Sequence, residues 1–424
     1  MPDFHPSPGA ANGGRSVTAN PTMAACSATG SIACVRRWRP LAGRDGHRRR
    51  RGYGAFFNAT ARRARAAARR LLRHGWQRLR AGRGQHLVNG NALVARLLRS
   101  ALDAGVRFQL NAPVVRLLQG PPGVSGAVLR SDGGEIHVEA GAVVLACGGF
   151  PHDRQRLAQV VPHAAEGYGH FSAAPPDNQG EGIRLGESVG GQFDTSLRHP
   201  LAWAPVSRVT LASGQQLMFP HLVERAKPGV IAVLPNGKRF VNEADSYHDF
   251  IAALLAATPA GDTPQAWLLA DRRALRRYGL GHARPFPFTP TAWLRTGYLQ
   301  RGNTLAELAK QCAIDANALA ETVERFNHFA SAGEDVDFHR GASAYNRAQG
   351  DHQVTLGPLR EGPFYAVRIL PGSLGTFSGL QTDEHARVLD EQQLPIPGLY
   401  AIGNDMSSVM RGYYPSGGIT LGPP

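Results

Sequence analysis

The C-terminal residues carry the pattern in this sequence that most suits ligand chemistry. Residues 398–404 (GLYAIGN) are typical of a short buried strand, with prolines before it and a glycine near its end. Residues 414–422 (YPSGGITLG) follow as a glycine-bearing turn that should open a helix. The unpaired N–H groups and partial positive charge of a helix start suit an electron-rich ligand edge. A strand, a loop and a helix start in any α/β protein would have the same spacing, so the pattern alone leaves both interpretations open.

These two segments resemble the C-terminal signature of FAD-dependent oxidoreductases of the fumarate reductase/succinate dehydrogenase flavoprotein superfamily. Within it, they are most similar to the 3-oxosteroid 1-dehydrogenase-like branch. In that superfamily a PIPGLYAAGN-type strand passes the flavin, and a YPGxG-T-LGP-type loop caps its pyrimidine end. The resemblance therefore implies FAD as cofactor. It places five residues at the flavin, namely Gly403, Asn404, Gly417, Thr420 and Leu421.

A second flavoprotein motif lies at residues 142–149 (AVVLACGG), which predict a buried strand running into a glycine turn. It resembles the superfamily's AxVLATGG-type strand, with Cys147 where threonine is usual. Two glycines let the backbone pass close to a cofactor, since no Cβ intervenes. By this resemblance Val115 lies by the adenine, while Ala146, Cys147 and Gly148 lie by the diphosphate and ribose.

A third motif, GKRFVNE at residues 237–243, resembles the superfamily's G-(R/K)-RF-x-NE. Tyr247 follows four residues after Glu243, where the steroid dehydrogenase branch places its catalytic tyrosine. The alternative for Tyr247 is a packed aromatic residue whose hydroxyl reaches the surface.

The resemblance implies desaturation of a C–C bond next to a ketone, with hydride transfer to flavin N5. Such a reaction needs a base for the α-proton, hydrogen-bond donors on the carbonyl, and a flat apolar cleft. By resemblance Tyr247 is the base, and the Tyr414 hydroxyl and Gly418 backbone N–H are the donors. The branch also draws a supporting tyrosine from an upstream segment, and Phe4 would stand there without the hydroxyl. The implied partners are a small apolar, steroid-like ketone and an external electron acceptor.

Two other functions stay open. A fumarate-reductase-type enzyme would need an arginine clamp and an arginine proton donor; Arg239 and Arg411 exist, but the tyrosine-rich loop at residues 413–418 argues against it. The chain could also be an inactive fragment unable to hold FAD. No G-x-G-x-x-G follows a predicted strand, so the βαβ unit that holds the FAD pyrophosphate is expected to be missing. The chain also ends at Pro424, where relatives continue into a helix, so it is expected to be truncated at both ends.

The positive charge is confined to the N-terminal part of the chain. The net charge of the whole chain is +15, and residues 1–84 alone carry 18 Arg, two Asp and no Lys or Glu. Clustered arginine would suit a nucleic-acid-binding arm, but the segment lacks lysine and interleaved aromatic residues, so nucleic acid is not the expected partner. Residues 22–52 match nothing in the superfamily, and their bias could come from GC-rich DNA read in a shifted frame.

The predicted fold class is α/β. We expect a Rossmann-like FAD-binding domain that lacks its N-terminal βαβ unit and carries an inserted α+β substrate-binding domain. The expected parts are a basic segment (1–84), the first part of the FAD-binding domain (85–200), the substrate-binding domain (201–362) and the returning segment of the FAD-binding domain (363–424).

Local patterns predict the elements that position these motifs. Predicted helices cover 61–80 and 92–102, strands cover 106–110, 114–118 and 362–372, a β-hairpin covers 124–138, Asn236-Gly237 forms a hairpin turn, and Thr304 and Asp315 cap two helices.

The remaining composition predicts a cytoplasmic protein. No run of 18 apolar residues and no apolar signal core occur in the sequence, so we expect no transmembrane segment. Four scattered cysteines without a disulfide framework fit a reducing compartment. Histidines without ligand-like partners at metal spacing predict no metal site.

Overall fold

The computed structural model describes residues 3–5, 22–23, 61–82, 85–87 and 89–418. The chain divides into two compact units, one formed by residues 16–111 and the other by residues 1–15 together with 112–424. Within the described residues, no helix combines the length and the apolar character that crossing a membrane requires.

The smaller unit consists mainly of two helices, α3 (Ala61–Ala81) and α4 (Asn89–Asp103), as their runs of alanine, leucine and arginine predict. Two short strands, β1 (Thr22–Met23) and β2 (His86–Leu87), pair antiparallel. The strand predicted over 106–110 does not form. Its three alternating apolar side chains stay half exposed, at 50% for Val106, 49% for Phe108 and 45% for Leu110. A strand needs a neighbour to satisfy its N–H and C=O groups, and this stretch has none among the described residues.

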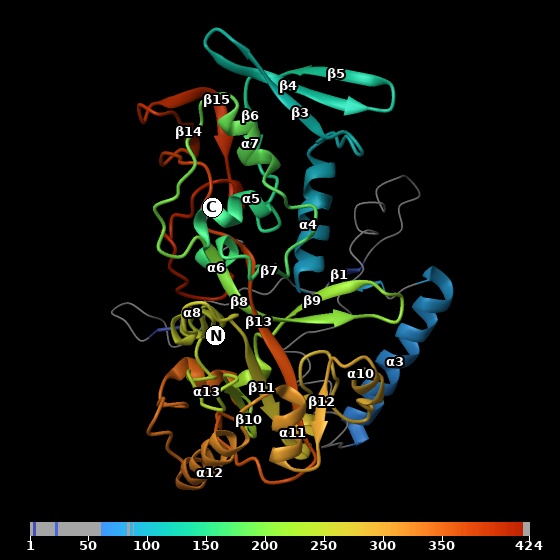
Figure 1. The fold of residues 1–424 in the computed structure, drawn as a ribbon. Coiled ribbons are helices and arrows are strands. Elements are labelled where there is room, and N and C mark those ends of the chain that lie inside the picture. Colours follow the sequence, from blue (N-terminus) through green and yellow to red (C-terminus); the bar gives the residue numbers. More distant parts are fainter. Residues whose placement is uncertain (1–2, 6–21, 24–60, 83–84, 88, 419–424) are drawn as a thin grey trace. The chain divides into compact units, whose positions relative to one another are not determined.

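The larger unit is built around a seven-stranded sheet (Figure 1). Its main path runs β10-β11-β13-β8-β9, and the short strands β12 and β7 also pair with β13. The strands are β7 (Phe171–Ser172), β8 (Leu201–Thr210), β9 (Gln216–Pro220), β10 (Val230–Val233), β11 (Ala266–Ala270), β12 (Gln300–Gly302) and β13 (Phe364–Thr376).

The strand predicted over 362–372 forms as β13, which pairs with β8 and β11 in the seven-stranded sheet. Its last residue, Thr376, donates through Oγ1 to the Asn404 carbonyl at 3.0 Å, so the strand ends beside the predicted FAD site. One prediction next to this sheet needs correction. Asn236-Gly237 makes a tight turn, in which the Gly237 N–H donates to the Leu234 carbonyl at 2.9 Å. The residues that follow the turn, 238–240, form no strand, so the turn does not close a β-hairpin.

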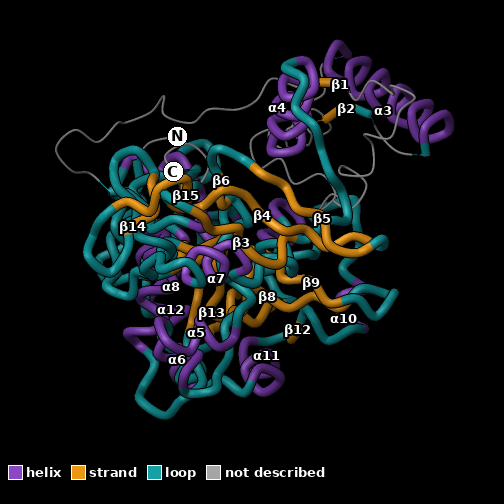
Figure 2. Tube along the Cα trace, turned by 90° about the horizontal axis from the view of Figure 1, so that it is seen from above, coloured by secondary structure: helices purple, strands orange, loops and turns teal. Residues whose placement is uncertain are grey.

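A second sheet, of order β14-β15-β6, carries the two predicted flavin motifs. Strands β6 (Val143–Leu145) and β15 (Pro395–Ala401) run parallel, with Leu399 opposite Val143, and β14 (Arg387–Leu389) covers the other edge of β15. An antiparallel meander of β3 (Val114–Gly120), β4 (Gly123–Ser131) and β5 (Gly134–Glu139) lies beside it (Figure 2). The meander confirms the predicted strand at 114–118 and the predicted hairpin.

Helices flank both sheets of the larger unit (Figure 1). The predicted caps form, since the Thr304 and Asp315 side chains accept from the Glu307 and Ala318 N–H groups. The helical elements are α5 (Arg154–Val160), α6 (Pro162–Ala165), α7 (Glu181–Glu187), η1 (Glu224–Ala226), α8 (Tyr247–Ala257), α9 (Arg272–Tyr278), α10 (Thr291–Arg295), α11 (Leu305–Cys312), α12 (Ala316–Ala332), α13 (Ala344–Gln349) and η2 (Gly403–Asp405).

Candidate active site

The carboxyl ends of β6 and β15 form one half of the site. The two strands are parallel and end side by side, which is where open α/β sheets bind their ligands. Ala146 and Cys147 after β6, and Ile402 and Gly403 after β15, are all exposed at this edge. Val144, within β6, is also 52% exposed.

Asp405 ties the two strand ends together. Its carboxylate accepts hydrogen bonds from the backbone N–H groups of Cys147 and Gly149, the latter at 3.0 Å, and its side chain is fully buried. Burial raises the pKa of Asp405, although the N–H donors favour its ionised form. Burial and the neighbouring carboxylate also raise the pKa of Cys147 to about 11, so its thiol is neutral. The sequence motifs did not single out Asp405, although an acidic residue directly after the GN of a strand-end motif is a usable signal.

The glycines at this edge test whether the site fits a cofactor. Gly148 and Gly149 have φ angles of 95° and 76°, which side-chain-bearing residues rarely adopt. A Cβ on Gly148 would meet the Asn178 side chain at 2.7 Å, and one on Gly149 would collide with Thr376 Oγ1. Gly403 instead faces open space, with no atom within 4 Å of the position that a Cβ would take. A close-packed glycine turn beside an open backbone edge fits the FAD that the sequence predicts.

A Gly148→Ala substitution should weaken FAD binding by about tenfold or more, because it strains the left-handed backbone and pushes Asn178 away. The measurement is a titration of flavin fluorescence against the parent and the variant. Gly134→Ala is the matched control, since Gly134 has a φ of 113° but open space around its Cβ position. Equal FAD affinity for Gly148→Ala and the parent would contradict the assignment of this turn.

Two tyrosines form the other half of the site. Tyr247 is the first residue of α8, and its hydroxyl donates to the Tyr414 hydroxyl at 2.7 Å. Their rings meet edge to face with centroids 5.2 Å apart. Both are buried in an apolar cluster with Phe4, Tyr345 and Phe377. The structure thus rejects the alternative that the Tyr247 hydroxyl reaches the surface.

The tyrosine pair adjoins the C-terminal glycine turn. The backbone N–H of Gly418 acts to lower the pKa of Tyr414, and a Cβ on Gly417 would lie 3.7 Å from the Tyr247 hydroxyl. Burial raises the pKa of Tyr247 well above its ordinary value, and the nearby Tyr414 adds to the rise. Burial also raises the pKa of Tyr414, while the bonds from Tyr247 and Gly418 oppose that rise. In the absence of ligand, both phenols are therefore neutral.

The N-terminal residues reach this cluster, as the sequence resemblance suggests. The Phe4 ring stacks on Tyr414 with centroids 5.4 Å apart and meets Tyr247 edge to face at 5.5 Å. The Phe4 N–H donates to the Pro415 carbonyl at 2.9 Å. His5 Nε2 lies 2.8 Å from Asp249 Oδ2 on α8. Phe4 therefore lies against both tyrosines and carries no hydroxyl toward them.

The predicted site residues fall into two groups in the structure. One group gathers in the tyrosine cluster and its turn, and consists of Tyr247, Tyr414, Gly417 and Gly418. The other lies at the strand ends, and consists of Ala146, Cys147, Gly148, Gly403 and Asn404. Val115 lies in β3 of the meander. Thr420 and Leu421 lie outside the described residues.

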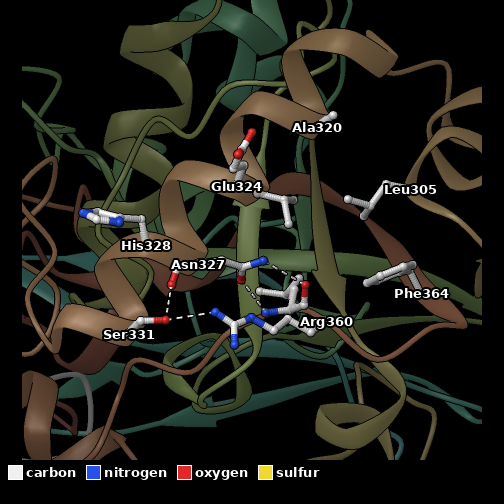
Figure 3. A pocket seen from close by; sticks show the side chains of 10 residues that line it. Leu305, Ala320, Glu324, Asn327, His328, Ser331, Arg360 and Phe364 are labelled. Carbon is white, nitrogen blue, oxygen red and sulfur yellow. Dashed lines mark hydrogen bonds between the residues drawn. The ribbon is translucent and has the colours of Figure 1, made fainter.

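An open groove of about 540 Å³ lies elsewhere, between α11, α12 and the segment around Arg360 (Figure 3). Asn327 holds the Leu359 backbone there through hydrogen bonds of 3.1 and 2.7 Å, and Arg360 donates to Ser331 Oγ at 3.0 Å. None of the predicted site residues lines this groove. Its polar groups hold α12 to the neighbouring segment, which is a structural task.

Comparisons with known proteins show the family to which the chain belongs. The model of the FAD binding domain family matches residues 18–421. A 4-oxocyclohex-2-ene-1-carboxylate 5-dehydrogenase from Sinomonas cyclohexanicum is 40% identical over 363 residues, covering 84% of this chain and 61% of that protein. A 3-oxosteroid 1-dehydrogenase from Mycolicibacterium smegmatis is 36% identical over 359 residues, covering 80% of this chain and 61% of that protein.

Among solved structures, the 3-ketosteroid Δ1-dehydrogenase from Sterolibacterium denitrificans, in complex with 1,4-androstadiene-3,17-dione, matches with a TM-score of 0.75 and 36% identity. The match covers 83% of this chain and 64% of that one. The chain spans 61% of the length of each of the two curated relatives above. FAD is the cofactor of the family. Because the family match runs through both the strand ends and the tyrosine cluster, the chain belongs to the FAD-binding flavoproteins that include 3-oxosteroid 1-dehydrogenases and fumarate reductases.

Proposed function

We propose that this chain carries the catalytic residues of an FAD-dependent dehydrogenase that desaturates a C–C bond next to a ring ketone. The observation that carries the proposal is the buried Tyr247–Tyr414 hydroxyl pair, 2.7 Å apart and adjoining the Gly418 amide. Removing an α-proton requires a base and hydrogen-bond donors for the developing enolate in a water-poor site. This arrangement supplies both groups within one apolar cluster.

Each residue has a distinct role in the proposed reaction. The Tyr414 hydroxyl and the Gly418 N–H donate to the ketone oxygen and stabilise the negative charge that forms on it. The Tyr247 oxygen takes the proton from the α-carbon. Phe4 and Phe377 cover the tyrosines and keep water out, which strengthens hydrogen bonds to a forming anion.

The strand-end residues fit FAD, and Ala146, Cys147, Gly148, Gly403 and Asn404 would hold it. When bound, FAD supplies an acceptor for the hydride that leaves the neighbouring carbon. We further propose that an external electron acceptor regenerates the oxidised cofactor between turnovers.

Two observations favour a cyclic ketone as the substrate class. The tyrosine cluster is walled by flat aromatic rings, which suit a ring substrate. The relatives described above act, by their names, on a cyclohexenone carboxylate and on a 3-oxosteroid. We therefore propose a six-membered ring ketone, either alone or as the end ring of a steroid.

The contacts of the arginines disfavour fumarate reduction. Arg239, a candidate for a carboxylate clamp, is 4% exposed and already binds Glu243 and Asp335, each through two hydrogen bonds. Arg411 is 68% exposed and faces Asp194 at 3.8 Å.

The test begins with the visible spectrum of the purified chain after FAD is added and free FAD is removed. If FAD stays bound, anaerobic addition of a 3-ketosteroid or of 4-oxocyclohexanecarboxylate should bleach the flavin bands. Fumarate should fail to reoxidise protein whose flavin has been reduced chemically. Bleaching by neither ketone, together with reoxidation by fumarate, would overturn the proposal. A chain that takes up no FAD would instead support the inactive alternative.

Tyr414→Phe should lower the rate of flavin bleaching by about 10²–10³-fold, because it removes one of the two donors on the ketone oxygen. Rapid mixing under anaerobic conditions measures this rate. Tyr413→Phe is the matched control, since Tyr413 is the adjacent residue and is 64% exposed. An unchanged bleaching rate in Tyr414→Phe would remove Tyr414 from the mechanism.

A further inference from the structure

A fully buried arginine, Arg225, contacts the segment that leads into helix α8. Its guanidinium donates three hydrogen bonds to backbone carbonyls. Nε binds His221 at 2.8 Å, Nη1 binds Glu243 at 2.8 Å, and Nη2 binds Asp245 at 3.1 Å. It also lies over the Phe250 ring, 5.1 Å from the centroid.

These contacts fix the start of helix α8. Glu243 and Asp245 belong to the turn that leads into the N-cap, Ser246, and Tyr247 is the next residue. Phe250 is on the first turn of the same helix. Arg225 thus hydrogen-bonds the backbone of Asp245, two residues before Tyr247, and packs on the ring of Phe250, three residues after it. A shift of the Arg225 guanidinium would therefore move the Tyr247 hydroxyl.

Within the described part of the chain, the charge of Arg225 has no direct counter-ion. No carboxylate oxygen there lies within 4.0 Å of its guanidinium, although Glu224, Asp245 and Glu243 act on it from further away. Buried charges are usually paired, because desolvation costs several kcal/mol per ion. By contrast, the buried Arg340 binds the Glu243 carboxylate directly at 3.0 Å. Arg225 therefore keeps a positive potential next to the tyrosines.

We propose that Arg225 is a positioning residue for Tyr247, which orients its hydroxyl through the α8 turn and stabilises its ionised form through a buried charge that no carboxylate pairs directly. This inference rests on the proposed role of Tyr247 as the base. Arg225 acts to lower the pKa of Tyr247, against burial, Tyr414 and Tyr345, which raise it. Arg225 also acts to lower the pKa of Tyr345, whose ring centroid lies 4.7 Å from that of Phe4. A tyrosine base needs such a charge, since an ordinary phenol has a pKa of about 10.

The experiment measures the ionisation of the side chain at position 247 directly, in protein that is not turning over substrate. Tyr247 is replaced by 3,5-difluorotyrosine, a more acidic phenol, in the full chain, and its ¹⁹F chemical shift is followed against pH. In this background Arg225→Gln should raise the ionisation midpoint by about one pH unit or more, because a buried unit charge is lost. Arg225→Lys keeps the charge and should hold the midpoint within about half a unit of the parent.

Arg156→Gln is the control for loss of a buried guanidinium, because Arg156 lies on α5 and pairs with Glu187. It should leave the midpoint unchanged. A midpoint that does not move in folded Arg225→Gln would overturn the inference. If Arg225→Gln does not fold, Arg225→Lys decides alone, and a rise of a full unit there would also overturn it. Because the ¹⁹F signal needs neither flavin nor substrate, failure of this inference is distinguishable from failure of the proposed dehydrogenase function.

Discussion

Replacing Tyr247 by phenylalanine should lower the rate of ketone-driven flavin bleaching by about 10²–10⁴-fold, the range for loss of a general base. The ring would stay in place, since its contacts with Phe4 and Tyr414 are made by the ring itself. The α-carbon would then have no oxygen to take its proton. Anaerobic rapid mixing measures the loss, and exchange of the ketone's α-protons with deuterated water, followed by NMR, should be lost with it.

The matched control for Tyr247→Phe is Tyr278→Phe. Tyr278 donates to Asp351 at 2.9 Å from α9, away from the cluster, so the control also loses a hydroxyl that makes one hydrogen bond. It should bleach at the parent rate. Tyr247→Phe with a parent-like bleaching rate would mean that another group takes the proton.

The pH dependence of the same rate follows from the burial of Tyr247. Burial, together with Tyr414, holds its pKa well above the ordinary value of a phenol, so the ionised base is a small fraction of the protein at neutral pH. That fraction grows as the pH rises. The bleaching rate should therefore increase with pH throughout the range in which the protein stays folded.

Local sequence signals predict the helices and strands that are determined by interactions between residues close in the sequence. Thr304 and Asp315 cap their helices because a side-chain oxygen next to free N–H groups needs no distant partner. The meander formed as predicted because its strands are neighbours in sequence and pair with each other. The tyrosine and glycine motifs were recognised by family resemblance, and the structure brings Tyr247 and Tyr414 together over 167 residues.

Features that depend on distant partners were not predictable in this way. Residues 106–110 alternate like a strand, but alternation says nothing about whether a neighbouring edge exists. Residues 362–372 form a strand, yet its sheet is decided by pairing with β8 and β11. Asp405 and Arg225 act through the backbones of Cys147, Gly149, Glu243 and Asp245. No side-chain pattern in the sequence marks a carbonyl or N–H group as a partner.

Loss of the Arg239 guanidinium should cost about 3–5 kcal/mol of unfolding free energy, because it leaves two buried carboxylates without their shared partner. Arg239 binds Glu243 at 2.8 and 2.9 Å and Asp335 at 2.8 and 3.1 Å, and the carboxylate side chains are fully buried. The variant is Arg239→Met, which keeps the apolar stem of the side chain and removes the guanidinium that lies over Phe326 and Phe338. Urea unfolding followed by circular dichroism measures the loss.

Arg325→Met is the matched control, since Arg325 also pairs with an aspartate and lies over a phenylalanine, but at the surface. Its unfolding midpoint should move by a small fraction of the shift in Arg239→Met. Equal shifts of the unfolding midpoint in the two variants would mean that the Arg239 ion pairs contribute no more than the exposed Arg325 pair. Such a result would contradict the prediction.

Lowering the pH should weaken the ion pairs of Glu243 in the parent protein and so lower its stability. Burial opposes ionisation of Glu243, but Arg239 and Arg340 outweigh it and hold its pKa at about 2, below the ordinary value of 4.5. A lowered pKa contributes stability that is complete above pH 4.5 and is lost as the pH falls toward 2. Glu243→Gln removes this titration, so the stability of that variant should fall less steeply than the parent's between these pH values. An equally steep fall would mean that other carboxylates carry the acid sensitivity, and that the ion pairs of Glu243 with Arg239 and Arg340 do not.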